Sequence, residues 1–161
     1  MTGIAFSEVS RSRTVRECEL LTERRYQDKK FRYVQLADDI SASSAIGTVL
    51  YQKTGAADGI VTDDISDANR NQYIGVAVCV AAASSYIWIQ YDGPFEAGKV
   101  QVALVSNTAV GDLLVGHATS DGVAARLTAG VAPLFAVIGR IEEIVGPTST
   151  SVAAWLTGKG I

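Results

Sequence analysis

Short apolar runs separated by Gly, Asp, Asn and Ser dominate the chain beyond residue 33. Runs of roughly four to eight residues that are rich in Val, Ile, Tyr and Trp are typical of β-strands. The candidate strands are YVQLA at 33–37, TVLYQ at 48–52, IGVAVCV at 74–80, YIWIQY at 86–91, KVQVALV at 99–105, LLV at 113–115, FAVIGRI at 135–141 and VAAWL at 152–156. Strands do not alternate with helical segments, so the pattern predicts a compact, all-β, antiparallel body of the barrel or sandwich type.

The first 30 residues have a different composition, because polar and charged residues outnumber apolar ones there. Val15, Cys18 and Leu21 have the spacing of one face of a weak helix between Thr14 and Tyr26. The segment has too few apolar positions to fold alone. We therefore expect an extended or partly helical N-terminal arm over residues 1–30 and a β-domain over residues 31–161.

The two halves of the β-domain resemble each other in sequence. Five matches occur in the same order at offsets of 63 to 67 residues: VQLA at 34–37 with VQVA at 100–103, SAIGTVLY from Ser44 with TAVGDLLV from Thr108, DGI at 58–60 with DGV at 121–123, Ile74-Gly75 with Ile138-Gly139, and Trp88-Ile89 with Trp155-Leu156. They predict an internal repeat over roughly residues 31–94 and 97–158, with Trp88 and Trp155 in equivalent strands. Each half is too small to bury its own apolar face, so the halves are expected to share a core. The alternative is that short β-proteins reuse the same turn residues.

Candidate chemistry is sparse. His117 is the only histidine, and the two cysteines, Cys18 and Cys79, lie far apart and are expected to be reduced thiols. A zinc site with four close ligands, a nucleophile elbow and a glycine-rich phosphate loop are all missing from the sequence. The acidic segment TDDISDANRN, with Asp63, Asp64, Asp67 and Asn69, lacks the spacing of a calcium loop, and its side chains are expected to cap turns. We predict no catalytic residue, metal or cofactor.

Composition and charge narrow the class further. With 48% hydrophobic and 19% charged residues, the chain is not of the disordered type. No apolar run reaches the roughly 18 residues of a membrane span, and no secretory signal is visible, so synthesis in the cytoplasm is expected. Residues 1–33 carry eight basic and five acidic residues, whereas the remainder has a net charge of −6. Because acids are interleaved with these bases and stacking aromatics are lacking, we expect the arm to dock on an acidic protein surface and not on nucleic acid. The alternative is a solvated leader.

The body resembles the head-decoration, or cement, proteins of tailed bacteriophages over about residues 31–158. The similarity is carried by a G-V-A-V strand at 75–78, a W-I-Q-x-x-G element at 88–93 and an A-V-G-D element at 109–112. The resemblance implies a β-tulip-like barrel or sandwich that binds the outside of an assembled shell, commonly as a homotrimer. It also implies the major capsid protein as partner, an N-terminal arm that crosses onto neighbouring coat subunits, and stabilisation of the capsid against the pressure of packaged DNA.

The expected capsid-binding residues are the arginines of the arm: Arg11, Arg13, Arg16, Arg24 and Arg25. If the arm is passive, the docking surface is expected on the loops at Asp38–Ser44 and Asp63–Asn71. A different interpretation is a receptor- or carbohydrate-binding β-domain of a phage tail or fibre, with a sugar site lined by tyrosines. Its candidates are Tyr26, Tyr33, Tyr73, Tyr86 and Tyr91. A third interpretation is a small hydrolase with a β-fold.

Overall fold

The fold is known from a computed structural model, which describes residues 12–37, 46–64, 66, 68–95, 98–105, 108–127, 136–146 and 148–157, apart from the side chains of 69–71, 104 and 105. These residues form twelve β-strands and no helix, which confirms the all-β prediction. It follows that this part of the chain offers no helix long and apolar enough to cross a membrane.

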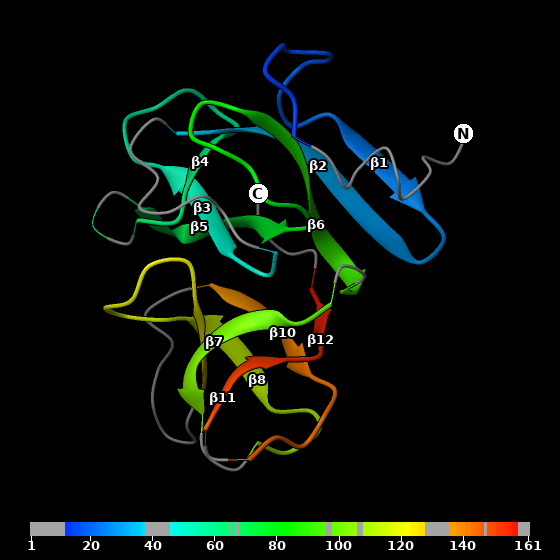
Figure 1. Cartoon of the computed structure of the whole chain (residues 1–161), viewed down its shortest axis with the longest axis vertical. Coiled ribbons are helices and arrows are strands. Elements are labelled where there is room, and N and C mark those ends of the chain that lie inside the picture. Colours follow the sequence, from blue (N-terminus) through cyan, green and yellow to red (C-terminus); the bar gives the residue numbers. More distant parts are fainter. Residues whose placement is uncertain are drawn as a thin grey trace.

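Five strands of the first half close into a small barrel, in the upper part of Figure 1. They are β2 (Lys29–Leu36), β3 (Val49–Lys53), β4 (Ile60–Thr62), β5 (Ala68–Ala77) and β6 (Tyr86–Pro94). β2 pairs with β4 in parallel, and the antiparallel pairs β4–β3, β3–β5, β5–β6 and β6–β2 complete the ring. Because the ring is closed, each of the five strands has a hydrogen-bonded neighbour on both sides.

The second half repeats this scheme in the lower part of Figure 1. Its strands are β7 (Val100–Val105), β8 (Leu113–Gly116), β9 (Ala124–Arg126), β10 (Val137–Ile141), β11 (Ser149–Val152) and β12 (Ala154–Leu156). β7 pairs with β9 in parallel, and β9–β8, β8–β10, β10–β12 and β11–β7 are antiparallel. β11 and β12 together take the place that the single strand β6 has in the first barrel.

The two barrels agree in register as well as in strand order. Leu50 lies opposite Gly75 in the first barrel, and Leu114 lies opposite Gly139 in the second. Trp88 and Trp155 lie in equivalent strands but not at equivalent positions. In the second barrel Arg140 pairs with Trp155, and its counterpart in the first barrel, Val76, pairs with Gln90. Trp155 is therefore equivalent to Gln90 and not to Trp88. The sequence match is displaced by two residues, a shift that keeps a side chain on the same face of its strand.

Alternate residues of every strand fill the two interiors. In the first barrel they are Val34, Leu36, Leu50, Val61, Ile74, Ile87 and Ile89. The equivalent positions of the second barrel are Val100, Val102, Leu114, Ala124, Ile138, Val152 and Ala154, all buried. The second set is smaller on average, because alanine replaces valine and isoleucine in two strands.

The outer faces of the two barrels differ in chemistry. On the first barrel, Tyr33, Tyr51, Tyr73 and Trp88 point outward from the interior set, yet they are buried in one cluster that is continuous with the interior of the second barrel. At three outward positions the second barrel carries exposed charges instead, Lys99 for Tyr33, Arg140 for Val76 and Glu142 for Val78, whereas Val115, the equivalent of Tyr51, is buried. The apolar face of the first barrel is thus covered inside the chain, whereas the charged part of the corresponding face of the second barrel meets solvent.

Backbone contacts fix the two barrels to each other. β12 pairs with the end of β6 through Trp155 with Pro94 and Leu156 with Gly93. At another point of the junction, the amide of Val49 donates to the carbonyl of Gly122 at 2.8 Å. These hydrogen bonds and the shared core join both barrels into one body.

The N-terminal segment departs from the expected arm. Residues 23–26 form β1 (Glu23–Tyr26), which pairs with β2, and a positive φ of 63° at Leu21 precedes it, so the chain is extended here and not helical. Cys18, Leu20 and Tyr26 pack against the shared core. The expected boundary between residues 30 and 31 therefore falls inside β2, and the described part of the arm belongs to the body. Its apolar residues were too few to predict a fold of their own, but they suffice to cover an existing apolar surface.

The repeated glycines at 75 and 139 generate a test of the barrel geometry. A Cβ at Gly139 would overlap the carbonyl oxygen of Trp155 and lie 3.0 Å from the Cα of Leu156, all backbone atoms that cannot yield without moving β12. We expect Gly139→Ala to lower the free energy of unfolding by about 1–3 kcal/mol. Gly146→Ala, where a Cβ meets nothing within 4 Å, is the matched control and should change it by less than about 0.5 kcal/mol. Urea titration measures both, and equal effects would contradict the close approach.

Candidate protein-interaction surface

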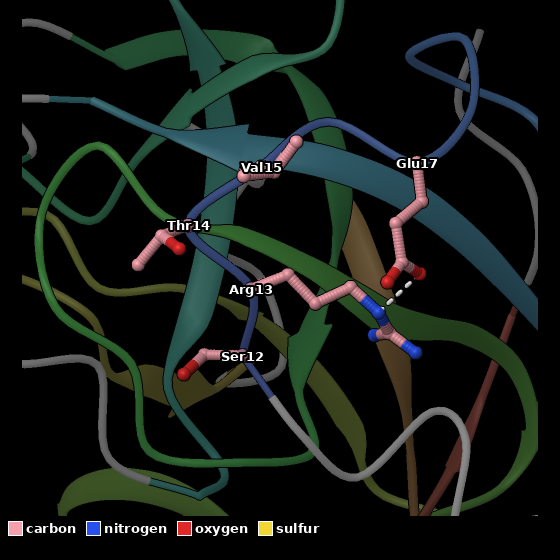
Figure 2. A pocket seen from close by; sticks show the side chains of 5 residues that line it. All are labelled: Ser12, Arg13, Thr14, Val15 and Glu17. Atoms are coloured by element: carbon pink, nitrogen blue, oxygen red, sulfur yellow. Dashed lines mark ion pairs between the residues drawn. The ribbon is translucent and has the colours of Figure 1, made fainter.

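Residues 12–22 form a strap that runs over the first barrel before β1 begins. At its start the amide of Arg13 donates to the carbonyl of Tyr86 at 2.8 Å, and the amide of Tyr86 donates back to Arg13 at 2.7 Å. The Arg13 guanidinium forms an ion pair with Glu17, shown as the dashed line in Figure 2, where Ser12 and Thr14 point away from the pair. The strap is therefore held by backbone pairing and not by its charges alone.

The middle of the strap is anchored on an aromatic cluster. The amide of Glu17 donates to the hydroxyl of Tyr33 at 3.1 Å, and the Tyr33 ring stacks on Tyr86 with centroids 6.0 Å apart. Burial raises the pKa of the Tyr33 hydroxyl, so this group stays protonated at neutral pH. Leu20 lies so close to the first barrel that a Cβ added at Gly59 would come within 2.7 Å of its Cβ.

A shallow hollow of about 390 Å³ lies along the strap and is lined by Ser12, Arg13, Thr14, Val15 and Glu17 (Figure 2). Its cation and its carboxylate are paired with each other, so the hollow offers no net positive charge to an anion. Its geometry does not favour a small-molecule site, because a ligand pocket buries most of its ligand among apolar walls.

The expected capsid-binding arginines divide into two groups. Arg11 lies outside the described residues, and the Arg13 side chain is only 9% exposed and engaged with Glu17. Arg16, Arg24 and Arg25 are exposed. These three form what we call the basic surface.

Two members of the basic surface flank Cys18. Nε of Arg16 donates to the Cys18 carbonyl at 2.9 Å, and the positive charge of Arg24 lowers the pKa of the same cysteine against the effect of burial. Arg25, the next residue of β1, points to the opposite face of the strand, and its Nε donates to the carbonyl of Gln27 at 3.0 Å.

The other basic residues of the leader are neutralised within the body. Nε of Arg32 lies 3.0 Å from the carboxylate of Glu23, and its guanidinium carbon lies 3.8 Å above the Tyr91 ring. Burial and the nearby Glu23 raise the pKa of Tyr91 to about 12. The ammonium of Lys30 pairs with Asp92 at 2.7 Å. Counting charges along the sequence does not distinguish Lys30 and Arg32 from the exposed arginines of the basic surface. The alternating pattern of β2, in which both lie, does indicate that they are strand residues.

The remaining candidates have structural roles where they are described. The loop Asp38–Ser44 and Asp67 lie outside the described residues. The carboxylate of Asp64 accepts hydrogen bonds from the amide and hydroxyl of Ser66 at 2.8 and 2.7 Å, which caps a turn. Nδ1 of His117 accepts from the amide of Thr119 at 3.2 Å.

The thiols and carboxylates do not assemble into a reactive group. Burial raises the pKa of Cys18 and raises that of Cys79 to about 11, so both thiols are protonated at neutral pH and weak as nucleophiles. Within the described ranges, no three His, Cys, Asp or Glu side chains are grouped to hold a metal ion.

Comparisons with known proteins show a similarity in fold to a solved structure. No protein-family model matches the chain, and no curated protein matches it. The crystal structure of the N base of the head fiber protein gp8.5 of bacteriophage phi29 aligns with a TM-score of 0.49 and 15% sequence identity, over 81% of this chain and 96% of that chain.

The docking of the strap can be tested by substitution. Leu20→Ala removes an apolar side chain that packs on the shared core, and we expect it to lower the free energy of unfolding by about 1–2 kcal/mol, less than a fully buried leucine would cost. Val15→Ala on the same strap is the control, because Val15 is 72% exposed and its loss should change stability by less than about 0.5 kcal/mol. Equal urea midpoints for Leu20→Ala and the parent chain would show that the strap is not part of the folded body.

Proposed function

We propose that the chain is a structural protein of a tailed-phage virion, which binds the outer surface of the assembled capsid and stabilises it against the pressure of packaged DNA. In this proposal the partner is the major capsid protein, and the protein is made in the host cytoplasm before it joins the virion. No cofactor, nucleic acid or membrane takes part.

The observation that carries the proposal is a closed two-barrel body with exposed arginines fixed on the strap and on both faces of β1. The segments that resemble decoration proteins meet in this body: the G-V-A-V strand pairs with the W-I-Q strand through Val76 and Gln90. The A-V-G-D element forms a turn in which the carboxylate of Asp112 accepts from the amide of Ala109 at 2.7 Å and pairs with Arg126 at 2.8 Å. The resemblance thus covers residues that build both barrels.

The position of the basic surface modifies the expected mode of binding. Arg16, Arg24 and Arg25 are presented by a docked strap and by β1, and not by a free arm. Their guanidinium groups suit carboxylates and carbonyl oxygens on a coat subunit. Because these arginines are already placed, binding costs less ordering entropy than a disordered arm would.

The tyrosines favour the capsid over a carbohydrate ligand. Tyr33, Tyr73 and Tyr91 are buried, so their rings cannot stack on a sugar, and Tyr26 and Tyr86 are half-buried. A receptor- or carbohydrate-binding domain of a tail or fibre is therefore the second hypothesis, and the binding experiment below includes it.

Assembly as a homotrimer is part of the proposal. A trimer over a three-fold position of the shell would engage several coat subunits at once, so that all contacts have to break together. Sedimentation velocity of the purified chain, together with a map of the decorated shell, reports the number of copies.

The binding test replaces the basic surface. We expect the triple variant Arg16→Ser, Arg24→Ser, Arg25→Ser to bind expanded empty shells of the phage that encodes the chain at least about tenfold more weakly, roughly 1.4 kcal/mol. Raising the salt concentration should weaken the parent chain more than the variant, because exposed ion pairs are screened. Lys53→Ser, a basic residue at the end of β3, is the control and should bind like the parent chain. Co-sedimentation with shells measures all three. Retention on host cells or glycans, with no binding to shells, would favour the second hypothesis.

A further inference from the structure

Exposed aliphatic side chains recur at equivalent places of the two barrels. Among the described residues, the large hydrophobic side chains with high exposure are Val15, Ile46, Val80, Val110, Leu113 and Ile144. Four of these six form two pairs, Ile46 with Val80 and Val110 with Ile144. Each member of one pair lies 64 residues from its counterpart in the other.

Hydrogen bonds of the first barrel bring the loops of the first pair together. The amide of Gly47 donates to the carbonyl of Ala77 at 2.9 Å, and the amide of Ala77 donates to the carbonyl of Thr48 at 2.9 Å. Ile46 immediately precedes this junction, and Val80 follows it by three residues. They are 42% and 61% exposed.

The second barrel has the same junction. The amide of Gly111 donates to the carbonyl of Ile141 at 2.8 Å, and the amide of Ile141 donates to the carbonyl of Asp112 at 2.7 Å. Val110 and Ile144, at the same offsets from it, are 61% and 76% exposed. The residue after Val80 and the residue after Ile144, which are Ala81 and Val145, are both buried, so these two loops also agree in orientation.

The recurrence contrasts with other exposed positions of the second barrel. Charged residues replace apolar ones where Lys99 stands for Tyr33 and Arg140 for Val76. Leu113, which is 42% exposed in place of the buried Val49, is the aliphatic exception. An exposed aliphatic side chain adds little to folding, because most of its surface stays in water. Two aliphatic pairs at matching exposed positions therefore point to contacts outside the chain.

The surrounding charges indicate the chemistry of the partner. Beside the second pair, Glu142 is paired with Arg140 at 3.0 Å, Glu143 with Lys99 at 2.6 Å and Asp112 with Arg126 at 2.8 Å. The loop of the first pair, residues 78–85, contains no charged residue. Ile46 also lines a hollow together with Lys99 of the second barrel, whose charge is the one paired with Glu143. Both contacts thus have a neutralised rim, which matches an apolar pocket on a protein and not a polyanion or an acidic membrane surface.

We propose that Ile46–Val80 and Val110–Ile144 are two copies of one contact, which seat on the same apolar pocket of two neighbouring, identical coat subunits of the shell. A chain that presents one contact twice at a fixed separation matches a partner that presents its pocket twice at a fixed separation. The coat subunit as occupant rests on the proposed function.

The test uses the full-length chain and the shells of the binding experiment above. Val80→Asp and Ile144→Asp each place a charge in one contact. The control, Thr54→Asp, places the same charge on an exposed residue directly after β3, outside both the pairs and the basic surface. Both contact variants should bind at least about tenfold more weakly, and to a similar extent, because each loses one of two linked sites. The double variant should lose binding altogether, and the control should bind as the parent does. The parent chain should saturate the shell at no more than one chain per two coat subunits.

Thermal unfolding checks that a loss of binding does not come from a loss of folding. The unfolding midpoints of all variants should stay within about 2 °C of the parent. If the parent and Thr54→Asp bind and the two contact variants bind equally well, the inference is wrong while the proposed function stands. If the parent itself does not bind shells, both are wrong. If the parent self-associates and the contact variants do not, the occupant is a second copy of the chain, and the assignment to the coat subunit is overturned.

Discussion

The apolar outer face of the first barrel is the constraint on which the rest of the structure depends. Its interior is filled by its own aliphatic residues, yet Tyr33, Tyr51, Tyr73 and Trp88 on the outside are also apolar and require cover. The second barrel covers part of this face, and the strap with Leu20 covers another part. Two barrels and a strap are thus held as one body by the burial of a single surface.

A body fixed in this way suits a protein that has to span a lattice. The basic surface and the two aliphatic pairs keep a set distance from one another, because each is attached to an element of the shared core. Rigid placement allows several weak contacts to act together without a new ordering cost for each. The charged outer face of the second barrel, with Arg140 and Glu142, keeps that side in solvent.

Most of the barrel architecture is predictable from the sequence because strand and turn residues carry it. Gly75 and Gly139 mark equivalent close approaches of two strands, and the runs around them predict a strand at both places. The bounds of the first were wrong, because β5 spans Ala68–Ala77 and the run was 74–80. The pairing of β2 with β4 in parallel was not predictable, since it joins segments by tertiary packing. The tryptophan match was misaligned by two residues because such a shift leaves the alternation of faces unchanged.

The docked strap and the aliphatic pairs required the structure. Leu20 and Cys18 stand among charged residues, and only the presence of an uncovered aromatic surface on the first barrel gives them a partner. Arg13 and Arg24 look alike in the sequence, but backbone pairing with Tyr86 turns the first into a buried structural residue. Exposure of Val80 and Ile144 likewise depends on loop geometry, which the strand pattern does not define.

The claim that both barrels form one body is tested most directly by equilibrium unfolding of two single-tryptophan variants. Trp155→Phe leaves Trp88 as a probe of the first barrel, and Trp88→Phe leaves Trp155 as a probe of the second. In each variant, urea unfolding followed by tryptophan fluorescence should coincide with unfolding followed by far-ultraviolet circular dichroism, in one cooperative transition. A fluorescence midpoint that departs from the circular dichroism midpoint in either variant, or a second transition, would show that the barrels unfold separately and would contradict the account.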